Sequence, residues 1–327
     1  MNWDALAATV LDGGRISRDD ALGMLQSSDA ELDALLGAAE TLRTHHFGRE
    51  VHLHVLHNAR RDQCPEDCSF CSQSSRYDTG IGAYPLEDVD TLVEAAHAAR
   101  AKGAVRYCMV TATRGPSNSD LDVICEAVRR IKDELPGLEI CTSLGLLNES
   151  RAGRLAEAGV DRYNHNLETS ERNFPNVTTT HDYSDRVNTV QAAHAAGMEA
   201  CCGGIVGLGE SLEDRVDLAF ALADLQVASV PLNFLDPREG TPMAHLVKPS
   251  PEDCLRTLAM FRFVHPSVDL RVAGGRETCL GDLQSTALRA ANSMFSEGYL
   301  TTPGQGVSDD FRMLNEAGYE VVEMINR

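Results

Sequence analysis

Long apolar runs, aromatic residues and positive charges are all scarce in this sequence. Of its 327 residues, 24% are charged and 5% aromatic. No apolar run approaches the roughly 20 residues that a membrane-spanning helix needs. The first residues, MNWDALAATVLDGG, lack the basic flank of a secretory signal. These absences predict a soluble, cytoplasmic protein.

The shortage of positive charge excludes one class of partner. There are 29 lysines and arginines against 49 aspartates and glutamates, which gives a formal net charge of -20. Phosphate backbones and anionic lipid surfaces repel such a chain, so neither nucleic acid nor a membrane is an expected partner. Cysteine, in contrast, is abundant, with ten residues. In a cytoplasmic chain of this length they indicate metal or redox chemistry rather than disulfides.

Short β-branched or apolar runs alternate with amphipathic runs of helical period through most of the chain. Eight strand signals separated by seven or eight helices favour an α/β fold in which the strands close into a (β/α)8 TIM barrel. A doubly wound open sheet is the alternative, but cysteines occupy the turn where that fold needs glycines. The expected strands cover residues 50–59, 104–113, 138–145, 161–169, 198–207, 228–236, 268–275 and 292–300.

The two ends of the chain lack strand signals. We expect an N-terminal helical extension at residues 1–45, the barrel at 46–305, and a C-terminal helix at 306–327 that packs on the barrel. Helix boundaries are also marked locally. Gly103 follows an amphipathic run where a C-terminal cap belongs, and Ser250 precedes Pro251 as an N-cap precedes a first helical residue.

Three cysteines follow the first expected strand. The stretch CPEDCSFCSQSSRY contains Cys64, Cys68 and Cys71, and in a barrel this loop lies on the face where active sites are built. A structural zinc site is the alternative, but zinc needs four ligands and no second CxxC pair is present. Three thiolates suit a [4Fe-4S] cluster with one iron left for another ligand.

This CxxxCxxC spacing resembles that of the radical S-adenosylmethionine (SAM) enzymes. The resemblance implies that Cys64, Cys68 and Cys71 hold a [4Fe-4S] cluster whose open iron binds SAM, which is cleaved to a 5'-deoxyadenosyl radical. It also implies that Phe70 flanks the nucleoside, whereas loop packing is the alternative role for that ring.

Further cysteines fall inside expected strands. Because pleating sends alternate side chains to opposite faces, Cys201 and its neighbour Cys202 cannot both point into the barrel. Any single strand cysteine is most simply an inert buried thiol, yet Cys108 and Cys141 lie in two further strands. Arg271 also lies in a strand, where it needs an anion or another acceptor if it is buried.

Together with the triplet, the runs YNHNLET, GGIVGLGE and GGRE make residues 50 to 305 similar to the biotin synthase family. In that family a second cluster, [2Fe-2S], lies deep in the barrel on three cysteines and one arginine. The resemblance implies that Cys108, Cys141, Cys201 and Arg271 are these ligands. The choice of Cys201 over Cys202 rests on that alignment alone.

Polar residues follow the fourth expected strand. Extended backbone over residues 161–169 would place Asn164, Asn166 and Glu168 on one face and turn His165 to the other, as a core histidine. The resemblance implies that Asn166 and Glu168 bind the SAM ribose and that Asn164, Asn166 and Asn233 reach the substrate, with Asn233 at its ureido ring. Solvated or capping side chains are the alternative for all of them.

Two further SAM contacts are implied by the same resemblance. Gly203, Ile205 and Gly207 would form the strand against which the adenine lies, since glycine lets a flat ring approach the backbone. Arg186 would bind the methionine carboxylate; a surface ion pair with Asp182 or Asp185 is the alternative.

The function implied is radical-mediated insertion of sulfur into dethiobiotin to form biotin, by a sulfurtransferase that uses SAM, the [4Fe-4S] cluster and the [2Fe-2S] cluster as sulfur donor. A homodimer and a flavodoxin or ferredoxin electron donor are implied as well. Hydrogenase-maturation and methylornithine-forming barrels are rivals that would share the triplet but not the strand cysteines or Arg271. A non-catalytic iron-sulfur or zinc protein is a third possibility. Cys125 is expected in the core, on the apolar face of its helix, and no role is predicted for Cys254 or Cys279.

Overall fold

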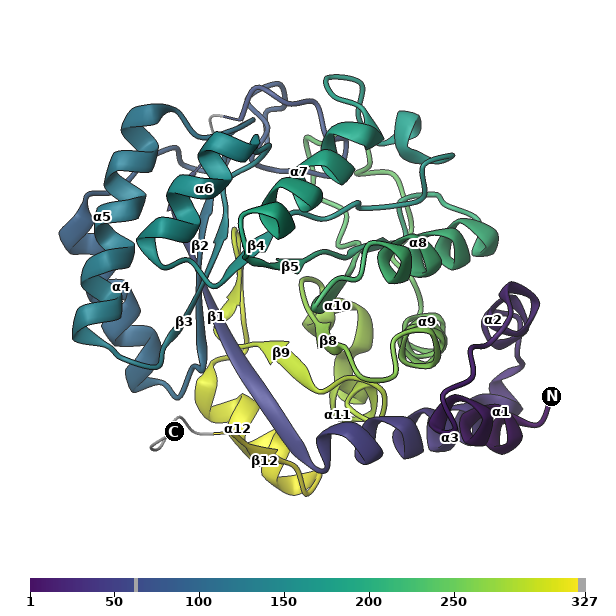
Figure 1. Ribbon diagram of the computed structural model, residues 1–327. Coiled ribbons are helices and arrows are strands. Elements are labelled where there is room, and N and C mark those ends of the chain that lie inside the picture. Colours follow the sequence, from purple (N-terminus) through teal and green to yellow (C-terminus); the bar gives the residue numbers. More distant parts are fainter. Residues whose placement is uncertain (62–63, 323–327) are drawn as a thin grey trace.

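The computed structural model describes residues 1–61 and 64–322, within which eight parallel strands close into a barrel (Figure 1). Hydrogen bonding between β1 and the last strand, in which His52 lies beside Ser293, completes the closure. The (β/α)8 prediction is confirmed. In order around the barrel the strands are β1 (Glu50–Arg60), β2 (Arg106–Thr111), β3 (Glu139–Ser143), β4 (Arg162–Asn164), β5 (Glu199–Cys201), β7 (Ser229–Phe234), β8 (Asp269–Val272) and β9 (Ser293–Phe295).

Helices cover the outside of the barrel because each presents one apolar face to the strands. The capping residues predicted from the sequence are found: Ser250 caps its helix through the Asp253 amide, and Gly103 follows its helix with a left-handed φ of 82°. The covering helices are α4 (Val89–Ala101), α5 (Asn118–Glu134), α6 (Glu149–Ala158), α7 (Tyr183–Ala195), α8 (Leu212–Asp224) and α9 (Pro251–Val264), with the short α10 (Arg276–Leu280), η2 (Gly281–Leu283) and α11 (Gln284–Ala287) between β8 and β9.

Both ends of the chain pack on the barrel (Figure 1). Helices α1 (Trp3–Leu11), α2 (Arg18–Leu25) and α3 (Asp29–Phe47) precede β1, and α2 and α3 contact α9. After α12 (Val307–Glu316), a short strand β12 (Glu320–Val321) runs parallel to the start of β1. The sequence predicted the helix but not this strand. The division at residues 45 and 305 stays a prediction.

Two expected strands are shorter than the sequence suggested. Strand β4 ends at Asn164, so Asn166 and Glu168 lie on irregular backbone, and Glu168 has a left-handed φ of 69°. The fifth expected strand breaks into β5 and β6 (Gly204–Val206), because the Asn166 side chain accepts a hydrogen bond from Gly203 N at 3.1 Å in place of a ladder partner. A side-chain amide thus inserts where a continuous sheet was expected.

The eighth expected strand also ends early, at Phe295. The chain then turns into a two-stranded hairpin, β10 (Gly298–Tyr299) and β11 (Thr302–Pro303). Glu297 and Leu300 adopt left-handed φ values of 72° and 51°, which reverse the chain direction. This hairpin, rather than a longer strand, carries Tyr299 over the barrel mouth.

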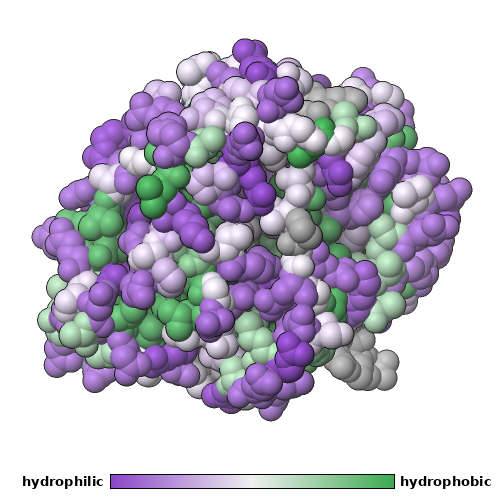
Figure 2. All heavy atoms as spheres, turned by 180° about the vertical axis from the view of Figure 1, so that it is seen from behind, coloured by the Kyte–Doolittle hydropathy of each residue, from purple (hydrophilic) through white to green (hydrophobic). Residues whose placement is uncertain are grey.

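Polar side chains cover most of the face seen in Figure 2, with apolar residues in separate groups. Among the described residues, the exposed large apolar side chains are Met1 and Val247. None of the helices in the described part of the chain has both the length and the apolar character to cross a membrane.

A buried ion pair anchors α12 to the barrel and gives a first test. Arg276 Nη2 donates to Asp310 Oδ1 at 2.7 Å, and neither side chain is more than 2% exposed. Breaking such a pair on one side leaves a buried charge, so Arg276→Met is expected to lower the free energy of unfolding by about 3–5 kcal/mol in urea denaturation. The exposed Arg312–Asp309 pair is the control: Arg312→Met should cost less than about 0.5 kcal/mol. Equal losses would contradict this account.

Candidate functional site

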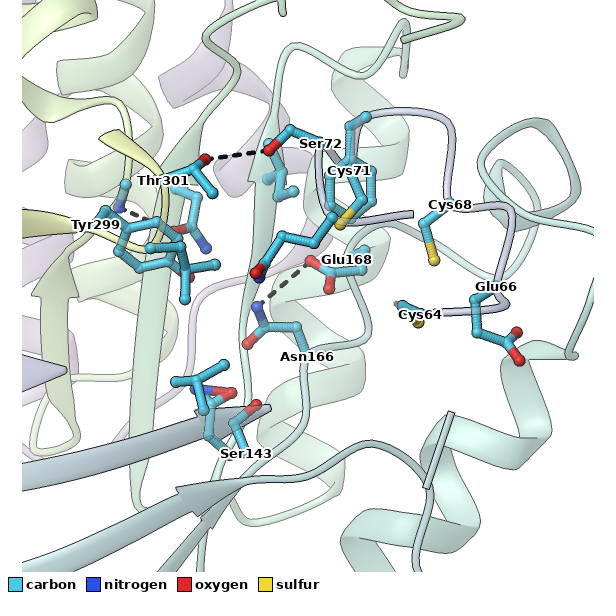
Figure 3. A pocket seen from close by; sticks show the side chains of 18 of the residues that line it. Cys64, Glu66, Cys68, Cys71, Ser72, Ser143, Asn166, Glu168, Tyr299 and Thr301 are labelled. Atoms are coloured by element: carbon cyan, nitrogen blue, oxygen red, sulfur yellow. Dashed lines mark hydrogen bonds between the residues drawn. The ribbon is translucent and has the colours of Figure 1, made fainter. Parts of the chain in front are cut away.

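A pocket of about 290 Å³ lies at the carboxyl ends of the barrel strands. Figure 3 shows the loop of Cys64, Cys68 and Cys71 on one side of it and the hairpin of Tyr299 and Thr301 on the other. Eleven of the predicted site residues line it: Cys64, Cys68, Phe70, Cys71, Cys108, Asn164, Asn166, Glu168, Arg186, Ile205 and Asn233. These predicted residues therefore share one continuous cavity, of which they form a part.

The triplet loop holds its thiols away from bulk water. Burial raises the pKa of the Cys64 thiol to about 11 and that of Cys71 to about 12, and it raises the pKa of Cys68 as well. All three are therefore protonated thiols near neutral pH in the protein alone. A thiol becomes a metal ligand only as its thiolate, so binding of a cationic iron centre here would release protons.

Two acids between the first two cysteines clamp this loop to residues 178–181. Asp67 Oδ1 accepts hydrogen bonds from Thr178 Oγ1 at 2.6 Å and from Thr179 N at 2.9 Å. Glu66 accepts from Arg114 Nη1 at 2.7 Å and contacts the His181 ring. This clamp could not be predicted from local sequence patterns, because its partners lie 48 positions away at Arg114 and more than 100 positions away at residues 178–181.

Arg186 lies at the centre of the polar side of the pocket. It is 6% exposed and donates to Asn166 O at 2.7 Å and to Glu168 Oε1 at 3.3 Å, and its Nη2 lies 3.8 Å from Cys68 Sγ. The surface pair with Asp182 or Asp185 is wrong, because the side chain is buried and turned inward. Burial raises the pKa of Glu168 in spite of the Arg186 charge. Because ionisation of Glu168 is disfavoured, Glu168 does not fully balance the positive charge of Arg186. The site therefore favours binding of a further anion beside Arg186.

The glycine-rich segment forms a wall that excludes side chains. A Cβ at Gly203 would lie 1.9 Å from Pro231 O, and one at Gly204 would lie 2.5 Å from Glu168 O. Gly207 has a left-handed φ of 102°. Beside this wall, Phe70 and Ile205 belong to one small apolar cluster. Neighbouring backbone thus fills the space beside Gly203 and Gly204, while Ile205 lines the pocket.

The strand cysteines meet inside the barrel. Cys108 and Cys141 are register partners on β2 and β3, and the neighbouring Cys108 thiol raises the pKa of the Cys141 thiol, which Cys201 also adjoins. Cys202 points the other way and is buried in the main hydrophobic core. The geometry thus separates the two adjacent cysteines as the pleat predicts. Cys141 and Cys201 lie behind the pocket lining and reach it through Cys108.

Arg271 closes this inner group. Its Nη2 donates to Ser229 Oγ at 2.8 Å and its Nη1 lies 3.6 Å from Cys201 Sγ. The Nε atom is buried without an acceptor among the described residues. A buried guanidinium with an unused donor, facing three thiols, fits an anionic iron-sulfur cluster.

The remaining wall of the pocket contains Asn233 and the β10–β11 hairpin, and most of it was not predicted from the sequence. Asn233, which was predicted, is fixed by Gly274 N at 2.9 Å and Gly204 O at 3.1 Å. The hairpin was not predicted: Tyr299 packs so closely that a Cβ at Gly274 would lie 2.8 Å from its ring, and Thr301 Oγ1 lies 3.1 Å from Ser72 Oγ (Figure 3). The glycine and proline run TTPGQG was the available signal for a turn here.

The donor chemistry of both groups fits clusters. The three loop thiols and Cys108 line the pocket, while Cys141, Cys201 and Arg271 lie behind its inner wall. In the described part of the chain, no three cysteine, histidine or acidic side chains gather as a ready site for a metal ion. His165, expected to turn away from the site into the core, is buried but lines the pocket, and burial lowers its pKa well below the ordinary value.

The sequence matches two family models. Residues 61–222 match the Radical SAM superfamily, and residues 231–320 match the Biotin and Thiamin Synthesis associated domain. The chain is 58% identical over 320 residues to a biotin synthase of Salinibacter ruber, covering 98% of this chain and 89% of the relative. It is 46% identical over 321 residues to a biotin synthase of Halalkalibacterium halodurans, covering 98% and 96%.

Solved structures support the same fold. A methylornithine synthase has a TM-score of 0.84 at 21% identity, with 97% of each chain covered. The FeFe-hydrogenase maturase HydG from Carboxydothermus hydrogenoformans has a TM-score of 0.84 at 17% identity, with 99% of this chain and 80% of that chain covered. At these identities the likeness concerns the barrel fold alone.

If the hydrogen bonds of Asp67 hold the triplet loop in place, they limit the access of an alkylating reagent to its three cysteines. Asp67→Ala in the metal-free protein should speed alkylation of Cys64, Cys68 and Cys71 by iodoacetamide at least about fivefold, the factor that loss of about 1 kcal/mol of hydrogen bonding gives. Peptide mass spectrometry measures each site, and the buried Cys254 serves as the internal reference. Asp78→Ala, at an exposed position nearby, is the control. Unchanged rates in Asp67→Ala would show that the clamp does not hold the loop.

Proposed function

This chain belongs to the biotin synthase family of radical SAM enzymes, and from that membership we propose how the residues of its pocket carry out the reaction. The reaction is sulfur insertion into dethiobiotin, which yields biotin with SAM, a [4Fe-4S] cluster and a [2Fe-2S] cluster as cofactors. The observation that carries the assignment of residues is that the three loop thiols and the strand thiol of Cys108 line one pocket, with Cys141 and Cys201 behind Cys108.

The outer residues would bind and orient the first pair of cofactors. Cys64, Cys68 and Cys71 would hold the [4Fe-4S] cluster, which the Asp67 and Glu66 clamp keeps at the pocket wall. Arg186 would bind the methionine carboxylate of SAM. SAM's other contacts would come from Phe70, Asn166, Glu168, Gly203, Ile205 and Gly207.

The inner residues would hold the second cluster on the other side of the substrate. Cys108, Cys141, Cys201 and Arg271 are the proposed ligands, and the contact between Arg271 and Cys201 supports Cys201 rather than Cys202. When bound, these cofactors supply the radical that removes hydrogen from unactivated carbons and the sulfur atom that replaces it.

The substrate would lie between these groups. The Asn233 amide is held at both ends by backbone groups, so its side chain is already oriented toward a ureido ring, and Asn164 and Asn166 lie on the same pocket wall. The hairpin of Tyr299 covers this space and would exclude water, which protects a reactive radical from side reactions.

An electron donor, a flavodoxin or ferredoxin, would dock near the triplet loop. Such donors are acidic, and two exposed arginines lie here despite the net charge of the chain: Arg76 on the triplet loop and Arg114 after β2. Arg76 Nε donates to Pro65 O at 2.7 Å and Arg114 to Glu66 at 2.7 Å, and both side chains are exposed. The homodimer and the cytoplasmic location are proposed on the family resemblance.

The first test is product analysis. The reconstituted chain, given dethiobiotin, SAM and a strong reductant without oxygen, should form biotin and 5'-deoxyadenosine, both measured by mass spectrometry. Formation of 5'-deoxyadenosine without biotin from the fully reconstituted wild type would contradict the proposed function.

A second test separates the two thiol groups. Cys108→Ala should still cleave SAM when the triplet is loaded but should form no biotin, because only the inner group has lost a ligand. Cys125→Ala, at a buried thiol on α5 outside the pocket, is the matched control and should form both products. Biotin formation by Cys108→Ala at the wild-type rate would remove Cys108 from the inner ligand set.

A further inference from the structure

One carboxylate near the inner thiols joins residues of four barrel strands, β2, β7, β8 and β9. Asp269, the first residue of β8, accepts a hydrogen bond on Oδ2 from Arg271 Nη2 at 3.1 Å and another from Arg106 Nη1 at 3.2 Å. The same oxygen accepts from Ser229 Oγ at 3.0 Å. Its Oδ1 accepts from Asn292 Nδ2 at 3.2 Å and from Ser293. We refer to these six residues as the Asp269 hub.

The hub fixes which edge of Arg271 faces the thiols. A guanidinium has five N–H donors in a rigid plane. In Arg271 the Nη2 end is occupied by Asp269 and Ser229, while Nη1 lies beside Cys201. The ring of Phe295 lies 5.0 Å from the guanidinium carbon and limits its tilt. Only the Nη1 edge and the unpaired Nε remain for a ligand.

The hub also offsets the charge of a second buried cation. Arg106 is 4% exposed, and it donates to Asp269, to Glu139 through Nε at 2.8 Å, and toward the buried His54 ring at 3.1 Å. Without Asp269, the buried guanidinium groups of Arg106 and Arg271 would have only the half-exposed Glu139 and the uncharged His54 ring nearby. Mutual repulsion would then push Arg271 out of its present place.

We propose that Asp269 is a positioning residue for sulfur insertion, acting through Arg271 to set the geometry of the inner cluster. The inference rests on the proposed function, because it takes Cys108, Cys141, Cys201 and Arg271 as the inner ligands. Nothing in the sequence motifs pointed to Asp269. Its role follows from the contacts that gather on one carboxylate.

Asp269→Asn is the test variant, since it keeps the size of the side chain and removes its charge. After anaerobic reconstitution with enriched iron, Mössbauer spectra count the two cluster types separately. We expect inner-cluster content to fall roughly 10-fold or more, as loss of an outer hydrogen-bond partner of a metal ligand does. The outer cluster and 5'-deoxyadenosine formation should be retained.

Two further variants distinguish positioning from folding. Arg106→Gln/Asp269→Asn removes one buried cation together with the anion, so its buried charge stays balanced, and it should fold yet still lack the inner cluster. Arg106→Gln alone keeps the Arg271–Asp269 contact and should assemble the inner cluster. Asp310→Asn, another buried carboxylate that pairs with an arginine, controls for general loss of stability and should leave the inner spectrum unchanged.

Two results would overturn the inference while leaving the proposed function intact: an inner cluster of wild-type content and spectrum in Asp269→Asn, or in the charge-balanced double variant. Failure of the wild type to assemble an inner cluster would overturn both the proposed function and this inference. Folding of each variant is checked by circular dichroism of the metal-free protein, which reports on the barrel independently of either cluster.

Discussion

The register of the closed barrel is the constraint on which the inner site depends. Side chains alternate between the two faces of a strand, so a slip of one residue would turn an inward set outward. Pairing of Cys108 with Cys141, of Asn164 with Cys201 and of Arg271 with Ser293 places groups from several strands at one depth. Closure between β1 and β9 prevents such a slip, because every strand has two neighbours. The inner thiols are therefore positioned by backbone hydrogen bonds before any cluster is bound.

The outer thiols are held in a different way. They lie on a loop, which has no hydrogen bonds between strands to fix it. The hydrogen bonds of Asp67 and Glu66 to residues 178–181 hold the loop instead. The outer thiols are half-buried, and their raised pKa keeps them protonated until cluster assembly removes the protons and stabilises the resulting thiolates. Arg186 beside Cys68 and Arg271 beside Cys201 give each group one nearby cation for this purpose.

Much of the fold could be predicted because its signals are local. The alternation of strand and helix periodicity predicted the (β/α)8 barrel. Ser250 and Gly103 marked helix ends through their own backbone geometry. The cysteine spacing and the family resemblance pointed to the pocket. Features that depend on distant partners were not visible. The fifth expected strand breaks because Gly203 N donates to the Asn166 side chain, and Asp269 accepts hydrogen bonds from three other strands and from Asn292, just before β9. An isolated Asp in a strand pattern carries no such information.

The central claim is that the inner group of ligands presents the sulfur that enters the product. The most direct measurement is a single turnover of wild-type protein whose clusters were assembled with heavy-isotope sulfide, with all other reagents unlabelled. The account predicts biotin that carries the heavy sulfur, formed as the Mössbauer signal of the inner cluster declines in proportion. Unlabelled biotin, or an inner cluster that stays intact while biotin forms, would contradict it.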